Sequence, residues 1–182
     1  DLKDFIMKRG LDLKFFLIIK LFFFNFLFFL SFSFIVLSHE IKPSVADIKI
    51  EENNFKVKIN LNIEAILSNM DLSKTLDTDL AENSDIYNQF RKKTPSQIES
   101  LLESYINGIT RNIYLFVDEK KVNLNYVSID VENNQNLEEP RESKIFFEAN
   151  IPKNSKLYKI SWTKNYGDLV IRDFTSQDNI FS

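Results

Sequence analysis

His39 is the residue with the clearest chemical potential, because the chain has one histidine and no cysteine. It follows an apolar stretch that ends at Leu37-Ser38. Cleavage after Ser38 would give His39 a free α-amine, which can chelate one metal ion together with its own imidazole. Imidazole suits nickel, copper and zinc, and nearby carboxylates could add ligands. The sequence predicts a metal site at His39, Glu40 and Asp47; the alternative is a signal-exit residue that happens to be histidine.

An acidic stretch offers a second kind of site. Asp77 and Asp79, with Glu82 and Asp85, could hold calcium through carboxylate oxygens. The stretch lacks the glycine and the D-x-D-x-D-G order of an EF-hand loop. We therefore favour an exposed, solvated acidic loop.

Aromatic residues near the C-terminus give a third candidate. Trp162, Tyr166 and Gly167 could form the floor of a ligand pocket. Tryptophan in a strand more often packs in a core, and Gly167 suits a turn, so packing is the favoured interpretation. Without cysteine or a G-x-S-x-G elbow, nucleophilic catalysis has little support. We expect no enzyme activity, with a paired-carboxylate hydrolase as the remaining alternative.

The first 38 residues have the composition of a secretory leader. Of the chain's 18 phenylalanines, 11 lie before residue 39, and basic residues precede the apolar run from Leu21 to Leu37. Val36 and Ser38 fit the −3 and −1 positions of a signal peptide. The alternative is an uncleaved anchor from Phe15 to Leu37, which is long enough for a bilayer core of about 30 Å. Both predict export to the periplasmic or cell-surface side of the cytoplasmic membrane.

These features predict three regions. Residues 1–38 form an N-terminal extension with a signal peptide or anchor, 39–173 an extracytoplasmic domain, and 174–182 a linker toward a missing C-terminal part. The whole chain carries a formal net charge of −3, and its basic leader makes the exported part more acidic still. That balance argues against nucleic acid or anionic lipid as a partner.

Hydrophobic periodicity predicts the elements of the exported part. Alternation from Phe55 to Glu64 indicates a strand, which would form a hairpin with the residues around Ile48 and Ile50. Residues 67–85 are expected to be mainly an exposed loop, followed by a helix from Ser84. Thr94, Pro95 and Gln97 have capping-box spacing, so a second helix should start there and stop at Asn107-Gly108.

Short alternating segments resume after these helices. They predict strands over 113–117, 122–126, 145–151, 158–162 and 169–172. Together with the first hairpin, this predicts a mainly β fold. We expect an immunoglobulin-like β-sandwich of about seven strands with a helical insertion after the second strand.

With these elements placed, the exported part resembles the N-terminal extracytoplasmic domain of HupE/UreJ-like membrane proteins. The resemblance covers nearly all of 39–173 as short spaced signals. These are His39-Glu40-Ile41-Lys42-Pro43-Ser44, Asp47, Asn62-Ile63-Glu64-Ala65, Tyr87, Phe90-Arg91, Pro95, Trp162 and Tyr166-Gly167-Asp168-Leu169-Val170-Ile171-Arg172.

The resemblance implies that the domain belongs to a larger protein. In that family it precedes a bundle of transmembrane helices, and the family name associates it with nickel supply to hydrogenase and urease. The expected partner is therefore a C-terminal transmembrane domain of the same protein, absent here, which makes the chain a fragment. The expected role is a non-catalytic domain that assists metal uptake through capture at the mature N-terminus. The alternative is a free-standing exported binding module with no metal role.

Overall fold

The computed structural model describes residues 15–26, 41–133, 136–137 and 139–175. The chain divides into two compact units, Asp1–Leu37 and Ser38–Ser182. Residues 15–26 of the first unit are helical with exposed side chains. Of the helices described, none has the length and apolar character needed to cross a membrane. The predicted cleavage site, His39 and Glu40 lie outside the described residues.

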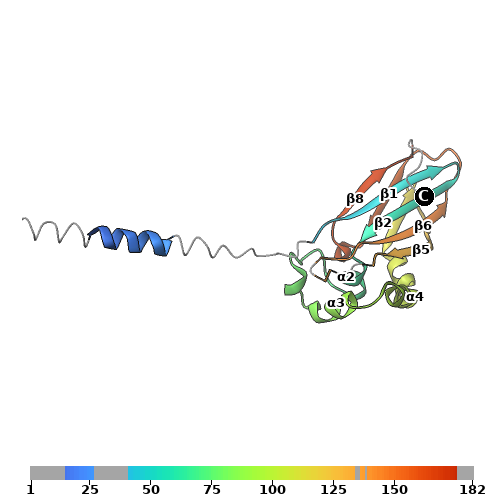
Figure 1. Cartoon of the computed structure of the whole chain (residues 1–182). Helices are drawn as coiled ribbons and strands as arrows, with labels where there is room; N and C mark the ends of the chain where they lie inside the picture. The colour runs from blue at the N-terminus through green and yellow to red at the C-terminus, as the bar shows by residue number, and fades with distance from the viewer. Residues whose placement is uncertain (1–14, 27–40, 134–135, 138, 176–182) are drawn as a thin grey trace, which may run out of the picture. The chain divides into compact units, whose positions relative to one another are not determined.

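A five-stranded sheet forms the main layer of the second unit. Its strands are β1 (Ser44–Glu51), β2 (Asn54–Leu61), β5 (Asn125–Val131), β6 (Ser143–Asn150) and β8 (Leu169–Asp173). They lie in the order β5-β6-β2-β1-β8 (Figure 1). All neighbours are antiparallel except β1 and β8, which pair in parallel. The predicted first hairpin is present as β1 and β2.

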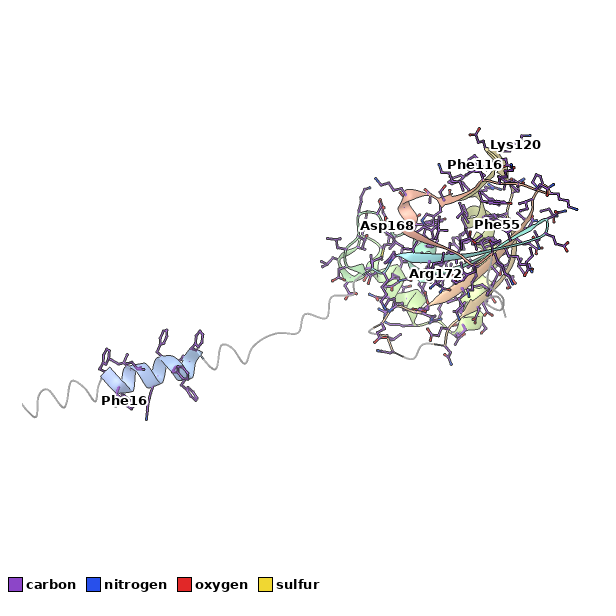
Figure 2. The ribbon with its side chains drawn as sticks, turned by 90° about the horizontal axis from the view of Figure 1, so that it is seen from above. Phe16, Phe55, Phe116, Lys120, Asp168 and Arg172 are labelled. Carbon is purple, nitrogen blue, oxygen red and sulfur yellow. The ribbon has the colours of Figure 1, made fainter. Side chains whose placement is uncertain are left out.

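A second, smaller sheet contains β3 (Ile113–Val117), β4 (Lys120–Val122) and β7 (Tyr158–Trp162), with β3 in the centre. Side chains from both sheets belong to one buried cluster, including Val57 and Phe147 of the large sheet and Leu115 of the small one. Between the sheets, the rings of Phe55 and Tyr158 stack with centroids 6.2 Å apart. Phe55 is labelled in Figure 2.

Helices fill the connection between β2 and β3. They are α2 (Ile63–Leu67), the 3₁₀ helix η1 (Thr78–Leu80), α3 (Ser84–Arg91) and α4 (Pro95–Arg111), and a second 3₁₀ helix, η2 (Lys164–Tyr166), precedes β8. Figure 1 shows α2, α3 and α4 gathered at one end of the large sheet. The predicted mainly β sandwich with a helical insertion after the second strand is confirmed. Its immunoglobulin-like connectivity stays a prediction.

The strand predicted over 55–64 ends earlier than expected. β2 stops at Leu61, and Asn62 begins a short helix by accepting a hydrogen bond from Ala65 N at 3.1 Å. Glu64, which the alternation placed in water, is therefore turned inward and fully buried. The exposed loop expected over 67–85 is also partly wrong, because Leu67, Met70 and Thr78 are buried within it.

The single strand predicted over 122–126 is two strands in different sheets. β4 ends at Val122 and β5 starts at Asn125, so the chain crosses between the sheets at Asn123-Leu124. Periodicity cannot detect this crossing, because Leu124 is buried on the path and keeps the apolar alternation intact. The described residues consequently contain eight strands.

The capping box of α4 is present, with the Thr94 side chain and the Gln97 side chain each bonded to the other residue's backbone. The predicted stop at Asn107-Gly108 is wrong. The helix continues to Arg111 because Ile109 packs into the core with 4 % of its surface exposed. Gly167, by contrast, has φ of +78° and makes the expected turn before β8.

Candidate functional site

Asp47, the one predicted metal ligand that the structure describes, is engaged in ion pairs. Its carboxylate accepts hydrogen bonds from Arg172 Nε at 2.6 Å and Arg172 Nη2 at 2.9 Å. Lys58 Nζ lies 3.4 Å away on the other side. Arg172 is on β8 (Figure 2) and is the register partner of Asp47 on β1. Two cations already neutralise this carboxylate, so a metal ion would have to displace at least one of them.

The acidic stretch does not gather its carboxylates around one point. Asp77 caps η1 by accepting a hydrogen bond from Asp79 N at 2.9 Å. Within the described part of the chain, no group of three or more His, Cys, Asp or Glu side chains is arranged to hold a metal ion. Asp79, Glu82 and Asp85 are exposed and Asp77 is half-buried, which agrees with the favoured interpretation of a solvated acidic loop.

Trp162 mainly supports the turn that follows it. Its Nε1 donates to Gly167 O at 2.9 Å, and its ring meets Tyr166 edge-on at 5.6 Å between centroids. Tyr166 and Gly167 line a hollow of about 320 Å³ with Ile41, Pro43 and Leu72. Trp162 thus packs against the turn, as the favoured interpretation expects, while Tyr166 and Gly167 line the hollow that the alternative proposed.

A different pocket, of about 190 Å³, combines apolar walls with buried charge. It lies where the chain enters β1, next to the helical insertion. Its lining comes from 41–45, 60–62, Leu72, Thr78, Tyr87, Arg91 and 140–142. The first of these segments directly follows the predicted metal-binding residues His39 and Glu40 in sequence.

Three buried charged residues lie at this pocket or directly behind its wall. Arg91 at the end of α3 and Arg141 before β6 line it, with 6 % and 4 % of their surfaces exposed, and Glu64 is fully buried behind them. Arg141 Nε lies 3.1 Å from Glu64 Oε1, although the two groups are not aligned as a hydrogen bond. The Arg91 guanidinium also stacks over the Tyr87 ring, 5.4 Å from its centroid.

Backbone carbonyls hold both guanidinium groups in place. Arg91 Nη2 donates to Leu137 O and to Glu139 O, and Arg141 Nη2 donates to Arg91 O and Lys93 O. Each arginine thus ties the helical insertion to the segment before β6. Because carbonyls are neutral, they orient the guanidinium groups without cancelling their charge.

Several buried side-chain atoms at the pocket and behind it have no hydrogen-bond partner among the described residues. They are Asn60 Oδ1, Arg141 Nε and Nη1, and both carboxylate oxygens of Glu64. Arg141 Nε and Glu64 Oε1 still face each other as an ion pair, whereas Arg141 Nη1 and Asn60 Oδ1 belong to residues that line the pocket. Tyr87 is satisfied, because its hydroxyl accepts a hydrogen bond from Asn62 Nδ2 at 2.9 Å. Buried polar groups are nearly always paired, so Arg141 Nη1 and Asn60 Oδ1 are exceptions at the edge of the pocket.

Electrostatics distinguish this cluster from the surface pairs. Burial raises the pKa of the Glu64 carboxyl above its usual value, and the Arg141 and Arg91 charges act against that shift. Burial also raises the pKa of Tyr87. The site therefore keeps two permanent cations beside a carboxyl group that ionises reluctantly.

The sequence interpretation missed this cluster because it assigned Glu64 to the solvent face of a strand. A usable signal was Asn62, since asparagine is among the preferred N-cap residues of helices. If a helix begins at Asn62, the strand alternation no longer assigns Glu64 to the solvent face. Nothing local connects Arg141 to Arg91, which lies 50 residues earlier.

No family model, curated protein or solved structure matches this chain in the comparisons with known proteins.

Proposed function

We propose that residues 39–173 form a non-catalytic extracytoplasmic domain of a HupE/UreJ-like membrane protein. The domain would assist metal uptake by capturing nickel, or copper or zinc, at a mature N-terminus that begins with His39. Its partner would be a transmembrane domain of the same protein.

One observation carries this proposal: residues that carry the resemblance, distant in sequence, contact one another in pairs. Asp47 binds Arg172, which lies 125 residues away. Asn62 donates to Tyr87 at 2.9 Å. Such contacts support the view that the spaced signals describe one folded unit rather than unrelated short matches.

One further contact of this kind joins two backbone groups: Ser44 N donates to Asp168 O at 3.0 Å. A local contact accompanies it, because the Trp162 side chain donates from Nε1 to Gly167 O at 2.9 Å. Asp168, labelled in Figure 2, immediately precedes β8. These contacts fix the segment that follows the predicted N-terminus against the segment that leads into β8.

The ligand set of the proposed metal site follows from the position of Asp47. Its ion pairs with Arg172 and Lys58 make it a structural carboxylate. We therefore assign the capture step to the His39 amine and imidazole, with Glu40 as the next carboxylate in the sequence. Asp47 would join only if Arg172 moved away.

The test is native intact-mass analysis of the chain expressed with its leader, with and without nickel, copper or zinc. We expect a chain that begins at His39 and retains one ion, and His39→Ala should lose that ion. Glu40→Gln should weaken retention, whereas Glu52→Gln is the matched control in the β1–β2 turn. Asp47→Asn should leave the ion bound.

Three outcomes would contradict the metal role. An uncleaved chain would remove the free amine, and a chain starting at His39 that binds no ion would leave a binding module without a metal. Ion retention in His39→Ala would place the metal elsewhere. The pocket at Arg91 and Arg141 favours the binding module as the second candidate, because it offers a site that needs no metal.

A further inference from the structure

The pocket between the helical insertion and the large sheet has an excess of buried positive charge. Arg91 and Arg141 are both buried, and Glu64 is the buried carboxyl group beside them. Buried charges are normally paired, because an uncompensated charge in a protein interior is strongly destabilising. Among the buried side chains that the structure describes here, two guanidinium groups and one carboxyl group leave an excess of positive charge, which an anionic ligand would balance.

The exposed charges at the pocket do not remove this excess. Lys42 and Glu142 also line it, with opposite signs and solvent-exposed side chains. Water screens such charges, so their effect on the pocket is small and nearly cancels. The buried arginines consequently determine the sign of the charge that the pocket accepts.

Unpaired atoms indicate where a ligand would bind. Arg141 lines the pocket, and its buried Nη1 has no acceptor among the described residues. Two carbonyls hold its Nη2, and Glu64 lies 3.1 Å from its Nε. A guanidinium held in this way with an unpaired N–H suits a carboxylate, which forms short charge-assisted hydrogen bonds with arginine. The second orphan, Asn60 Oδ1, would accept a hydrogen bond from a hydroxyl or protonated group of the ligand.

The remaining walls select a ligand with an apolar body. Pro43, Leu61, Leu72 and Pro140 line the pocket. A volume of about 190 Å³ is below the ~300–1,000 Å³ of pockets for drug-sized molecules. An inorganic anion would leave these apolar walls uncovered, whereas a short aliphatic or aromatic acid would fill them.

We propose that this pocket binds a small organic acid, with its carboxylate on Arg141 and its apolar body against Leu61, Leu72 and Pro140. This inference does not depend on metal capture at His39. Acid binding and metal capture can be refuted separately, because acid binding depends on the folded pocket and metal capture depends on the cleaved N-terminus.

The experiment is calorimetric titration of the purified full chain, in non-ionic detergent at pH 7, with benzoate and hexanoate. Benzamide is the control for shape without charge, and inorganic phosphate is the control for charge without an apolar body. We expect benzoate to bind at least tenfold more tightly than benzamide, and phosphate to bind more weakly than either acid. Added nickel should leave benzoate affinity unchanged.

Single substitutions can test whether benzoate binds in this pocket. Asn60→Asp places a negative charge on the wall and should weaken benzoate binding roughly tenfold or more. Asn150→Asp is the matched control, because it makes the same change at the opposite end of the β2–β6 ladder. Asn150 pairs there with Asn54, whereas Asn60 lies near the end that lines the pocket. Benzoate affinity should be unchanged in this variant. Arg141→Gln should abolish binding, with circular dichroism reporting whether the variant still folds.

Several results would overturn the proposal. Benzoate that shows no binding at millimolar concentration, or that binds no better than benzamide, would refute charge recognition. Equal effects of Asn60→Asp and Asn150→Asp would place any bound acid elsewhere. Phosphate binding as tightly as benzoate would refute the selection for an apolar body.

Discussion

Glu64 and Glu51 both lie beside basic side chains, yet their pKa values move in opposite directions. Glu51 is on the surface, and hydrogen bonds from Lys49 and Lys56 lower its pKa to about 2. Glu64 is fully buried, and loss of hydration raises its pKa despite the nearby arginines. At the residue scale, burial therefore outweighs the neighbouring charges at Glu64 and is outweighed by them at Glu51.

This difference predicts opposite pH dependences of stability. The folded protein holds the Glu64 proton more tightly than the unfolded chain, whose carboxyl pKa is about 4.5. The stabilising contribution is complete below that value and is lost as pH rises through the folded pKa. Relative to the wild type, Glu64→Gln should therefore gain unfolding free energy as pH rises from 4 to 8 in urea denaturation.

Glu51→Gln is the control with the reverse sign. The lowered pKa of Glu51 gives stability that is present above about 4.5 and is lost as pH falls toward about 2. Glu51→Gln should therefore have a slightly lower unfolding free energy than the wild type at neutral pH, and this difference should disappear in acid. A pH-independent difference between Glu64→Gln and the wild type would contradict the burial argument.

At the residue scale, the sequence predicted chemistry only where neighbours in the chain supplied it. Asp47 was a plausible ligand because it follows His39 closely, but its actual partner, Arg172, lies 125 residues away. Arg91 and Arg141 were not singled out as site residues, because exposed and buried arginines have the same local patterns. Long-range pairing decides which of these charged groups meet.

At the element scale, local signals predicted where α4 begins but not where it ends. The capping box is a short-range device, and its residues bond as their spacing predicts. The end depends on tertiary packing, because burial of Ile109 outweighs the preference of Gly108 for a left-handed stop. Gly108 is thus a helix-interior glycine.

Gly108→Ala should therefore stabilise the protein. The added Cβ meets no atom within 4 Å, and alanine in a helix interior is favoured over glycine by about 0.5–1 kcal/mol. Thermal and urea unfolding would measure the gain. Gly167→Ala is the contrasting variant: at φ of +78°, with Leu72 Cβ 3.1 Å from the new carbon, it should destabilise. Destabilisation by Gly108→Ala would instead indicate that the helix ends there.

Sheet membership was harder to predict than strand existence. The segments 113–117 and 158–162 are strands as expected, whereas the alternation over 122–126 conceals a change of sheet. The connection between β4 and β5 is only two residues long, so no loop signal separates them. An apolar pattern predicts which residues are buried, but it does not predict which of the two sheets they belong to.

At the scale of the whole molecule, β8 closes the fold by returning to β1. The pairing runs in parallel from Ser44 with Leu169 to Ile48 with Asp173. Ser44 N bonds Asp168 O at one end, and Phe174 N bonds Ile48 O at the other. This strand therefore holds the first strand of the domain, and with it the segment that leads into the pocket.

Removing β8 should consequently destabilise the entire domain rather than fray one edge. A chain that stops after Gly167 loses the β1–β8 ladder and the Arg172 pair of Asp47, and its unfolding free energy should fall by on the order of 3 kcal/mol. A chain that stops after Thr175 keeps every one of these contacts and is the matched control. Urea unfolding of both should separate them. If both chains unfold at the same urea concentration, β8 is dispensable, and the pocket-lining residues before β1 must be held by the helical insertion alone.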